Sequence, residues 1–403
     1  MWQKVAKPFV EAGELVVLGV VQEQHPDRAR LYRQWREMDW PILVDSLNLL
    51  DVAVVPVPIA IDEAGIVRHT GLRPEMLEKA FLKQVRFRDK ETAATVEPAV
   101  RPDPDQLRRE AKRSNRARAW RDTGDAYFLF GGANGIDESA EAYRRAIQID
   151  PKDGRAHFRL GTALRRRSDS DRRQSGDAQG AVEHWGRALA IQPNQYIWRR
   201  RLQQYGPRLD KPYNFYFWVE QAREDIRRRG LKPIELSVEP LGSEIAPPLR
   251  KTAAADIKIP DRDPDGRIHR DETGMVRIET TVVPARVQPG QPVRVRAQFR
   301  VNDDTRPFWN NEARDLTLWV GLPDGLRLGE GQFTFANPAE PETQELRVLE
   351  FECVVSGSHA PGRVELPGYA LYYVCAKKDG KCRFLRQDFR VSFDVDPSAP
   401  RLR

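Results

Sequence analysis

The sequence predicts a multidomain protein in which an α/β part, an all-α part and an all-β part follow one another. Three observations predict it. Residues 1–90 alternate apolar runs with amphipathic segments, residues 105–229 have helical periodicity, and beyond residue 274 apolar and polar side chains alternate with period two. At 403 residues the chain is long enough for two to four domains of roughly 100–200 residues each.

The charge balance is mildly basic, with 66 Lys and Arg against 59 Asp and Glu, a net charge of +7. The arginines stand among acidic residues, as in RREAKRSNRARAWRD at 108–122, which is typical of solvated helix faces. A nucleic-acid stripe would need aromatic residues placed along it, so we expect no nucleic-acid partner. No apolar run reaches the ~18 residues of a membrane helix, so we expect no membrane span.

Residues 1–90 show the element order of an α/β domain. The run ELVVLGVV at 14–21 predicts a buried strand of a parallel sheet, and residues 27–38 have the spacing of an amphipathic helix. A proline-containing linker over 91–104 follows. The remaining expected elements are a helix over 2–12, a strand over 41–45, a hairpin of strands 57–62 and 66–71, and a closing helix over 74–85.

The run LVVLGVV at 15–21, the helix after it and the block DVAVVPVPIAIDEAGIVR at 51–68 resemble the thioredoxin-like redoxin family of the AhpC/TSA type. The resemblance implies a thioredoxin-like fold in which Pro56 is a cis-proline that faces the redox cysteines. It also implies a hairpin turn over Asp62–Gly65. Without the resemblance, Val55–Pro56 would be expected to be trans, because few X–Pro bonds in folded proteins are cis.

This region departs from the family at the position that carries the chemistry. The family's redox cysteine ends the first strand, where the first helix begins, and a helix N-terminus lowers a thiol pKa. Here the first expected helix starts almost at Met1, and residues 1–90 contain no cysteine. We expect either a translation start placed too late, which we favour, or a degenerate structural fold. Without its first strand, the truncated fold would leave a sheet edge unpaired and part of its core open.

The compartment depends on the same question. The first residues do not have the pattern of a secretory signal. We expect an extracytoplasmic, periplasmic location if the true start lies upstream, and a cytoplasmic one otherwise.

Residues 105–229 resemble tetratricopeptide repeats. The strongest sign is the pair of endings AYRRAIQIDP and HWGRALAIQPN. The helices are interpreted as a docking groove for a protein partner or as a rigid spacer, with helices over 195–205 and 213–229 as caps. The positions that fit the repeat are Trp120, Gly124, Ser139, Tyr143, Ala146 and Pro151 in the first copy, and Leu160, Gly161, Leu164, Ala181, Trp185, Ala188 and Pro193 in the second.

An acidic loop, DRDPDGRIHRDE at 261–272, lies in a second linker over residues 230–273. The prolines and the following strand favour a plain acidic linker, and a calcium site is the second interpretation. Oxygen ligands at positions 1, 3, 5 and 12 and glycine at position 6 are the EF-hand pattern. Those positions are held here by Asp261, Asp263, Asp265, Glu272 and Gly266.

Residues 274–397 are predicted to form an immunoglobulin-like antiparallel β-sandwich of about seven strands. The segment YALYYVCAKKDGKCRFLRQDFRVSFDV at 369–395 resembles the thiol–disulfide interchange domain at the N-terminus of DsbD-type reductases. In that family two cysteines flank a short turn and pass electrons, and Cys375 and Cys382 match them.

Turn chemistry supports the cysteine pair independently. The Asp-Gly in AKKDGK is a hairpin signal, and a four-residue loop over 377–380 would place Cys375 opposite Cys382, within disulfide reach. The lysine-rich turn would lower the thiol pKa. A structural disulfide and two reduced thiols stay open as alternatives. Cys353 alternates with apolar residues in VLEFECVV and is expected to be an inert core thiol.

The sequence therefore predicts thiol–disulfide exchange, or delivery of reductant to a partner protein, through Cys375 and Cys382. The alternative is a non-enzymatic tetratricopeptide scaffold with a degenerate thioredoxin-like domain. The polar and aromatic segment 307–316 would line a site beside the pair or form a capped turn. The histidines show no zinc-ligand spacing, and calcium is the only cofactor the sequence suggests.

Overall fold

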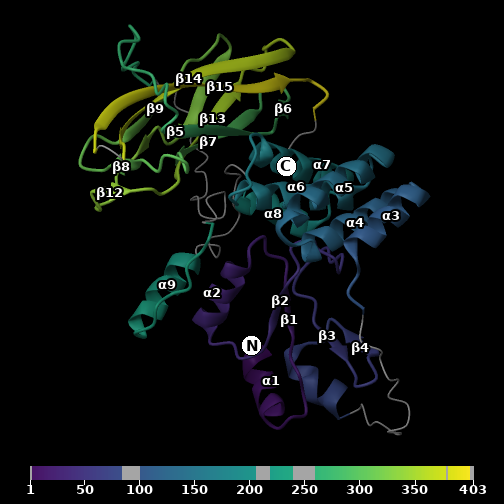
Figure 1. Cartoon of the computed structure of the whole chain (residues 1–403). Coiled ribbons are helices and arrows are strands. Elements are labelled where there is room, and N and C mark those ends of the chain that lie inside the picture. The colour runs from purple at the N-terminus through teal and green to yellow at the C-terminus, as the bar shows by residue number, and fades with distance from the viewer. Residues whose placement is uncertain (1, 84–99, 206–217, 239–258, 378–379, 400–403) are drawn as a thin grey trace. The chain divides into compact units, whose positions relative to one another are not determined.

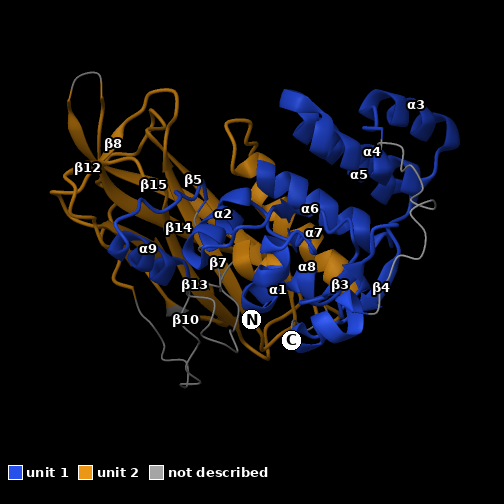
Figure 2. Cartoon of the chain, turned by 90° about the horizontal axis from the view of Figure 1, so that it is seen from below, with its two compact units in different colours: residues 1–166, 191–200, 217–239 blue, residues 167–190, 201–216, 240–403 orange. Residues whose placement is uncertain are grey.

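The computed structural model describes residues 2–83, 100–205, 218–238, 259–377 and 380–399. It contains both helices and β-sheets, as expected for a multidomain chain with α and β parts (Figure 1). The chain divides into two compact units (Figure 2). One contains residues 1–166, 191–200 and 217–239, and the other contains residues 167–190, 201–216 and 240–403. The division passes through the predicted helical domain.

The N-terminal region has the element order that the sequence predicts. The strands β1 and β2 pair in parallel, and β3 and β4 pair antiparallel as a separate two-stranded sheet. The closing helix is a 3-10 turn followed by a π-helical turn, and the end expected at 84–85 lies outside the described residues. The elements are α1 (Trp2–Glu11), β1 (Gly19–Val21), α2 (Pro26–Arg36), β2 (Ile42–Val44), β3 (Ile59–Ile61), β4 (Val67–Thr70), η1 (Pro74–Met76) and η2 (Leu77–Leu82).

The prediction of a buried strand over residues 14–21 is wrong in length and in burial. The strand β1 covers only Gly19–Val21, and Val16 and Leu18 before it are 87% and 52% exposed. The physical reason is the number of neighbouring strands, because among the described residues β1 pairs only with β2, in a two-stranded sheet. A run of this composition is buried when strands or helices cover both of its faces.

The hairpin turn and the proline before it follow the sequence prediction. The Val55–Pro56 peptide is cis, as predicted; Val283–Pro284 is also cis, which the sequence did not indicate. The Asp62 carboxylate accepts the backbone N–H groups of Ala64 (3.0 Å) and Ile66 (2.9 Å) and closes the β3–β4 turn. Gly65 takes a positive φ of 77° there, which glycine adopts without a Cβ clash.

The middle of the chain is helical, as predicted. In the first unit, α4 and α5 pack closely because Gly124 has no side chain: a Cβ there would lie 2.4 Å from a carbon of the Tyr143 ring. The Tyr143 hydroxyl donates to Asp125 (2.8 Å) on α4. The helices are α3 (Pro104–Ser114), α4 (Ala117–Phe130), η4 (Gly132–Asn134), α5 (Gly135–Ile149), α6 (Gly154–Ser168), α7 (Asp177–Ile191), α8 (Tyr196–Tyr205) and α9 (Trp218–Arg228).

The helix α9, expected as a cap of the helical stack, packs on α2, where Leu31 is buried against Val219, Ala222 and Ile226. The Trp35 indole stacks on Trp218 at 5.9 Å. Residues 213–217, the rest of the aromatic segment, lie outside the described residues.

The C-terminal strands form two sheets. One has the strand order β10–β13–β7–β5, and the other follows β11–β9–β14–β15–β6 with β8 and β12 beside it. Side chains from both sheets share one buried cluster, and burial along β13 alternates residue by residue as predicted. The strands are β5 (Val276–Val283), β6 (Arg286–Val287), β7 (Pro292–Val301), β8 (Phe308–Asn310), β9 (Leu316–Val320), β10 (Leu326–Gly331), β11 (Thr334–Phe335), β12 (Glu342–Thr343), β13 (Arg347–Val355), β14 (Gly362–Cys375) and β15 (Cys382–Val395).

These two sheets have more strands than the roughly seven that the sequence predicts. The additional short strands β6, β8, β11 and β12 have two or three residues each. A period-two pattern needs about four residues to be visible, so the sequence could not show them. Within the described residues, no helix combines the length and the apolarity that crossing a membrane requires.

Candidate thiol–disulfide site

The β14–β15 hairpin places the two predicted cysteines directly opposite each other. The strands pair in unbroken antiparallel register from Gly362↔Val395 to Cys375↔Cys382 at the turn. The two Cα atoms are 3.9 Å apart, and a disulfide joins the side chains. The structure therefore confirms that Cys375 and Cys382 meet, with the pairing that the four-residue loop predicts.

The two cysteines have different surroundings. Cys375 is buried, with 1% of its surface exposed, whereas Cys382 at the start of β15 is exposed. An attacking thiolate must approach one sulfur of a disulfide, and access selects which one. Of the two residues, Cys382 is the one that a partner can reach.

Segment 307–316 supplies the neighbouring strand on the buried side of the pair. The strand β8 pairs with β14 through Cys375↔Phe308 and Val374↔Trp309, so this segment is a strand here and not only a capped turn. The Trp309 ring is fully buried, and its Nε1 donates to the Glu345 carbonyl (2.9 Å). It therefore covers the sandwich interior next to Cys375.

A buried arginine contacts the strand β8 and the residues around it. The Arg347 guanidinium lies 4.3 Å from the centre of the Trp309 ring and donates to the side chains of Asn337 (2.9 Å), Glu345 (2.9 Å) and Asn311. Burial lowers the pKa of Arg347 from its ordinary value. Since each N–H that leaves water needs a partner, this network fixes the segment that flanks Cys375.

Cationic residues flank the exposed cysteine in the sequence. Lys377, Lys381 and Arg383 are exposed on the turn and on β15, as the sequence predicts. Lys378, which the sequence also placed there, lies outside the described residues. Positive charge near a thiol favours its thiolate, the form that attacks disulfides.

The third cysteine is separate from this site. Cys353 on β13 is buried and makes no disulfide, and burial raises the pKa of its thiol to about 12. The interpretation of Cys353 as a core thiol is confirmed.

A hollow of about 740 Å³ lies beside β15, at the residues that directly follow Cys382 in the sequence. One wall is Arg383, Phe384 and Leu385 of β15, and the other is the segment 267–273. That segment, which the sequence placed in a linker, runs beside the sandwich. The backbone of Arg270 forms an isolated parallel β-bridge with that of Arg386 on β15. No pattern in the sequence indicates the hollow, because its two walls are about 110 residues apart.

The acidic loop does not gather its carboxylates as a calcium site would. The Asp263 carboxylate is buried and accepts Arg386 (2.7 Å) and the backbone N–H of Arg267 (2.7 Å), while Asp261 accepts the Tyr369 hydroxyl. Asp265 pairs with Arg267, and Glu272 is exposed and lines the hollow. Within the described residues, no group of three or more His, Cys, Asp or Glu side chains is placed to hold a metal ion.

The loop does not form a calcium site because the Asp263 carboxylate has other partners. Burial alone would raise the pKa of Asp263, but hydrogen bonds from Arg386 and from the backbone N–H groups of Ile268 and Arg267 lower it below its ordinary value. Its carboxylate is thus used to dock the loop on β15. A calcium ion would have to displace those donors.

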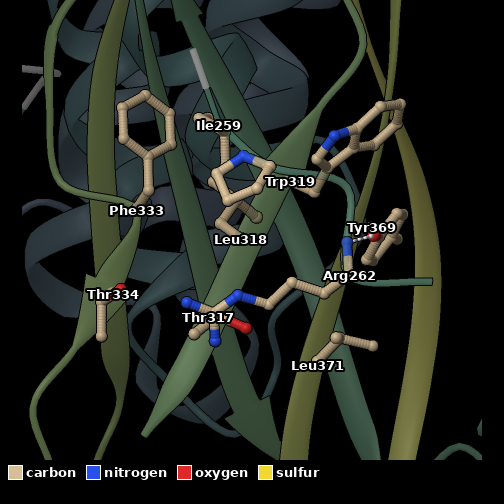
Figure 3. A pocket seen from close by; sticks show the side chains of 10 residues that line it. Ile259, Arg262, Thr317, Leu318, Trp319, Phe333, Thr334, Tyr369 and Leu371 are labelled. Carbon is tan, nitrogen blue, oxygen red and sulfur yellow. Dashed lines mark hydrogen bonds between the residues drawn. The ribbon is translucent and has the colours of Figure 1, made fainter. Parts of the chain in front are cut away.

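A second hollow, of about 230 Å³, lies between the start of that loop and the sheet (Figure 3). Trp319 and Tyr369 stack at 5.1 Å on one side of it, and Phe333 lies on the other. The Tyr369 hydroxyl accepts the backbone N–H of Arg262 (3.0 Å). We attribute this hollow to the packing of residues 259–262 on the sheet.

Pro56 belongs to one compact unit, and Cys375 and Cys382 belong to the other.

Comparisons with known proteins add little. No protein-family model matches the chain, and no curated protein matches it by sequence. Among solved structures, it is similar to the GAE domain of yeast GGA1, with 17% identity, 30% of this chain and 94% of that chain covered and a TM-score of 0.20. It is also similar to a type I cohesin of Pseudobacteroides cellulosolvens, with 14% identity, 30% and 94% covered and a TM-score of 0.19. Likenesses this slight carry no argument.

Proposed function

We propose that the protein carries out thiol–disulfide exchange, or delivers reductant to a partner protein, through Cys375 and Cys382. The observation that supports this most is the asymmetry of the pair: a buried and an exposed cysteine face each other at the end of a hairpin. Lys381 and Arg383 flank the exposed one in the sequence, and positive charge near a thiol favours its thiolate.

The exchange begins from the reduced pair. The Cys382 thiolate attacks one sulfur of a partner disulfide, forms a mixed disulfide and expels one partner thiolate. The Cys375 thiol loses its proton and attacks the Cys382 sulfur, which expels the second partner thiolate. The protein then holds the Cys375–Cys382 disulfide and the partner holds two thiols, so two electrons have moved. A donor dithiol protein restores the reduced pair by the same steps in reverse.

The finer fold assignments belong to the same proposal. We infer that residues 1–90 are a thioredoxin-like domain, that residues 105–229 are tetratricopeptide-type helices and that residues 274–397 are an interchange-type sandwich. The element order of residues 2–82 and the tight Gly124–Tyr143 contact between α4 and α5 support the first two. The helices would then dock a protein partner or act as a spacer.

The second candidate function is a non-enzymatic scaffold in which the cystine is a structural bridge. The burial of Cys375 and the pairing of its strand with β8 favour this alternative, because a bridge held on both sides resists opening.

Equilibration in glutathione buffers, followed by alkylation and mass measurement, separates the two functions. An exchange pair should have a potential between about −270 and −120 mV, whereas structural bridges lie below about −300 mV. Cys353 serves as the internal control, because its buried thiol should be alkylated only after unfolding. A pair that stays oxidised across the whole buffer series would leave the scaffold as the function.

A further inference from the structure

We propose that the hollow beside Cys382 binds an extended acidic segment of the partner protein, next to the disulfide that is exchanged. This inference rests on the proposed function and adds to it the chemistry of the partner. Three features of the hollow carry it: an open strand edge, a cationic lining and an exposed aromatic ring.

The first feature is the edge of β15. Backbone N–H and C=O groups of alternate residues on a strand point to the same edge. At Arg386 they meet the neighbouring segment, since Arg386 donates to the His269 carbonyl (2.8 Å) and accepts the Asp271 N–H (3.0 Å). The backbone groups of Phe384 and Cys382 therefore point to that edge too, into the hollow.

Within the described residues, the neighbouring segment bridges β15 only at Arg386. The edge from Leu385 back to Arg383 therefore lines the hollow and is not part of a ladder, and Cys382 is the next residue along it. An extended peptide can add to such an edge through main-chain hydrogen bonds, as in β-strand addition. That placement would bring a partner cystine to the exposed cysteine.

The second feature is the charge of the lining. Its ionic side chains are three arginines and one carboxylate, with His269 beside them. Arg267 pairs with Asp265 (2.9 Å) and Arg270 with Asp388 (3.2 Å), whereas no ion pair to Arg383 is recorded among the described residues. Lys377 and Lys381 extend the positive surface onto the turn. A peptide with glutamate or aspartate side chains is the complement of this surface.

The third feature is Phe384, which is 36% exposed and stacks on Tyr373 across the hairpin at 4.5 Å. It shares a face of β15 with Cys382, two residues before it, because side chains alternate along a strand. The ring offers an apolar contact to the residue next to the partner cysteine. The fit is therefore to an acidic peptide with an apolar residue near its cystine.

The test uses three synthetic peptides of equal length, each with one internal disulfide and a leucine beside it, flanked by glutamates, lysines or glutamines. Their reduction by the reduced full-length protein is followed by mass measurement. Each rate is divided by that peptide's rate with dithiothreitol, an uncharged dithiol, to remove intrinsic reactivity. At low salt the glutamate peptide should react about tenfold faster than the lysine peptide, at the low end of electrostatic steering.

Two variants locate the effect. Arg383→Glu should abolish or reverse the preference, and Arg327→Glu should leave it unchanged. Arg327 is a matched control, since it is also exposed on a strand without a recorded ion pair in the described residues, but lies on β10 in the other sheet. A change in Cys382 reactivity caused by Arg383→Glu affects all three peptides and cancels in the ratio.

A binding measurement separates this inference from the proposed function. Labelled peptides with serine in place of cysteine are titrated with the oxidised protein, and fluorescence anisotropy reports binding. Selective binding of the glutamate peptide without any exchange would sustain the hollow as a docking site and overturn the exchange function. Exchange at equal normalised rates for all three peptides, with equal binding, would overturn the inference and leave the function standing.

Discussion

The β-sandwich and the N-terminal strands both contain apolar, β-branched residues, but these residues differ in burial. In β7, Val293, Val295, Ala297 and Phe299 are completely buried. In the first region, Val16 is 87% exposed, and the strand residues β2 Leu43 and β3 Ile61 are each 54% exposed.

The difference teaches that composition predicts a strand, whereas neighbours decide its burial. The strand β7 pairs on both sides, with β5 and β13, and a second sheet covers its inner face. Within the described residues, the strand β1 pairs only with β2, and β3 only with β4, so both small sheets keep unpaired edges.

The largest expected effect compares a core residue with an exposed one. Phe299→Ala should lower the free energy of unfolding of the sandwich by about 3–5 kcal/mol, because it leaves a cavity in the core. Leu43→Ala, at a position that is 54% exposed, should change the stability of its own region by less than about 0.5 kcal/mol. Native-state hydrogen exchange of β7 and β2 measures both regions in one protein. Equal losses would contradict the comparison.

The next effect sharpens the account of the sandwich. Replacing both Cys375 and Cys382 by alanine should lower its stability by roughly 2 kcal/mol, since a disulfide across a sequence separation of 7 constrains a short loop. Reduction of the unmodified protein should have the same effect, and urea unfolding with and without a phosphine reductant checks it. The loss should stay below that of Phe299→Ala. A collapse of the β14–β15 pairing instead would indicate that the bridge is the main support of the hairpin.

The sequence predicted the parts of the site that depend on local order. The spacing of Cys375 and Cys382 around an Asp-Gly turn was enough to predict that they meet. The partner strand β8 has three residues, too few for a periodic pattern, so the sequence alone does not show segment 307–316 to be a strand and allows a capped turn. The acidic loop has the spacing of a calcium pattern, but spacing alone does not show which partner each carboxylate has. Asp263 pairs with Arg386, which is 123 residues away.

A smaller effect concerns two aspartates that close turns, one in each region. Burial alone would raise the pKa of Asp263 and of Asp62, but their hydrogen bonds outweigh it and hold both pKa values below the ordinary range. A carboxylate with a lowered pKa stabilises the fold above its unfolded pKa of about 4, and that contribution is lost as pH falls through the lowered value. The sandwich and the β3–β4 hairpin should therefore both lose stability in acid.

The two regions should differ in how much they lose. The partner of Asp263, Arg386, is 14% exposed, whereas Arg68, which pairs with Asp62, is 46% exposed and better screened by water. Asp263→Asn should thus flatten the acid dependence of the sandwich more than Asp62→Asn flattens that of the hairpin. Hydrogen exchange of β15 and β4 between pH 5 and about pH 3 follows both. If Asp62→Asn changed the acid dependence of the hairpin more than Asp263→Asn changed that of the sandwich, then screening by water would not decide which region loses more stability.

The smallest expected effect tests most directly whether the apolar residues before β1 are exposed to solvent. Val16→Lys should leave the free energy of unfolding within about 0.5 kcal/mol, because a side chain that is 87% exposed keeps its water. Val295→Lys is the matched control: it places the same charge at a fully buried position of β7 and should prevent the sandwich from folding. Thermal unfolding followed by circular dichroism, together with hydrogen exchange of β1, measures both. If Val16→Lys were costly, Val16 would have to be covered in solution, by another chain or by a second copy, and the contrast between the two regions would belong to the isolated chain only.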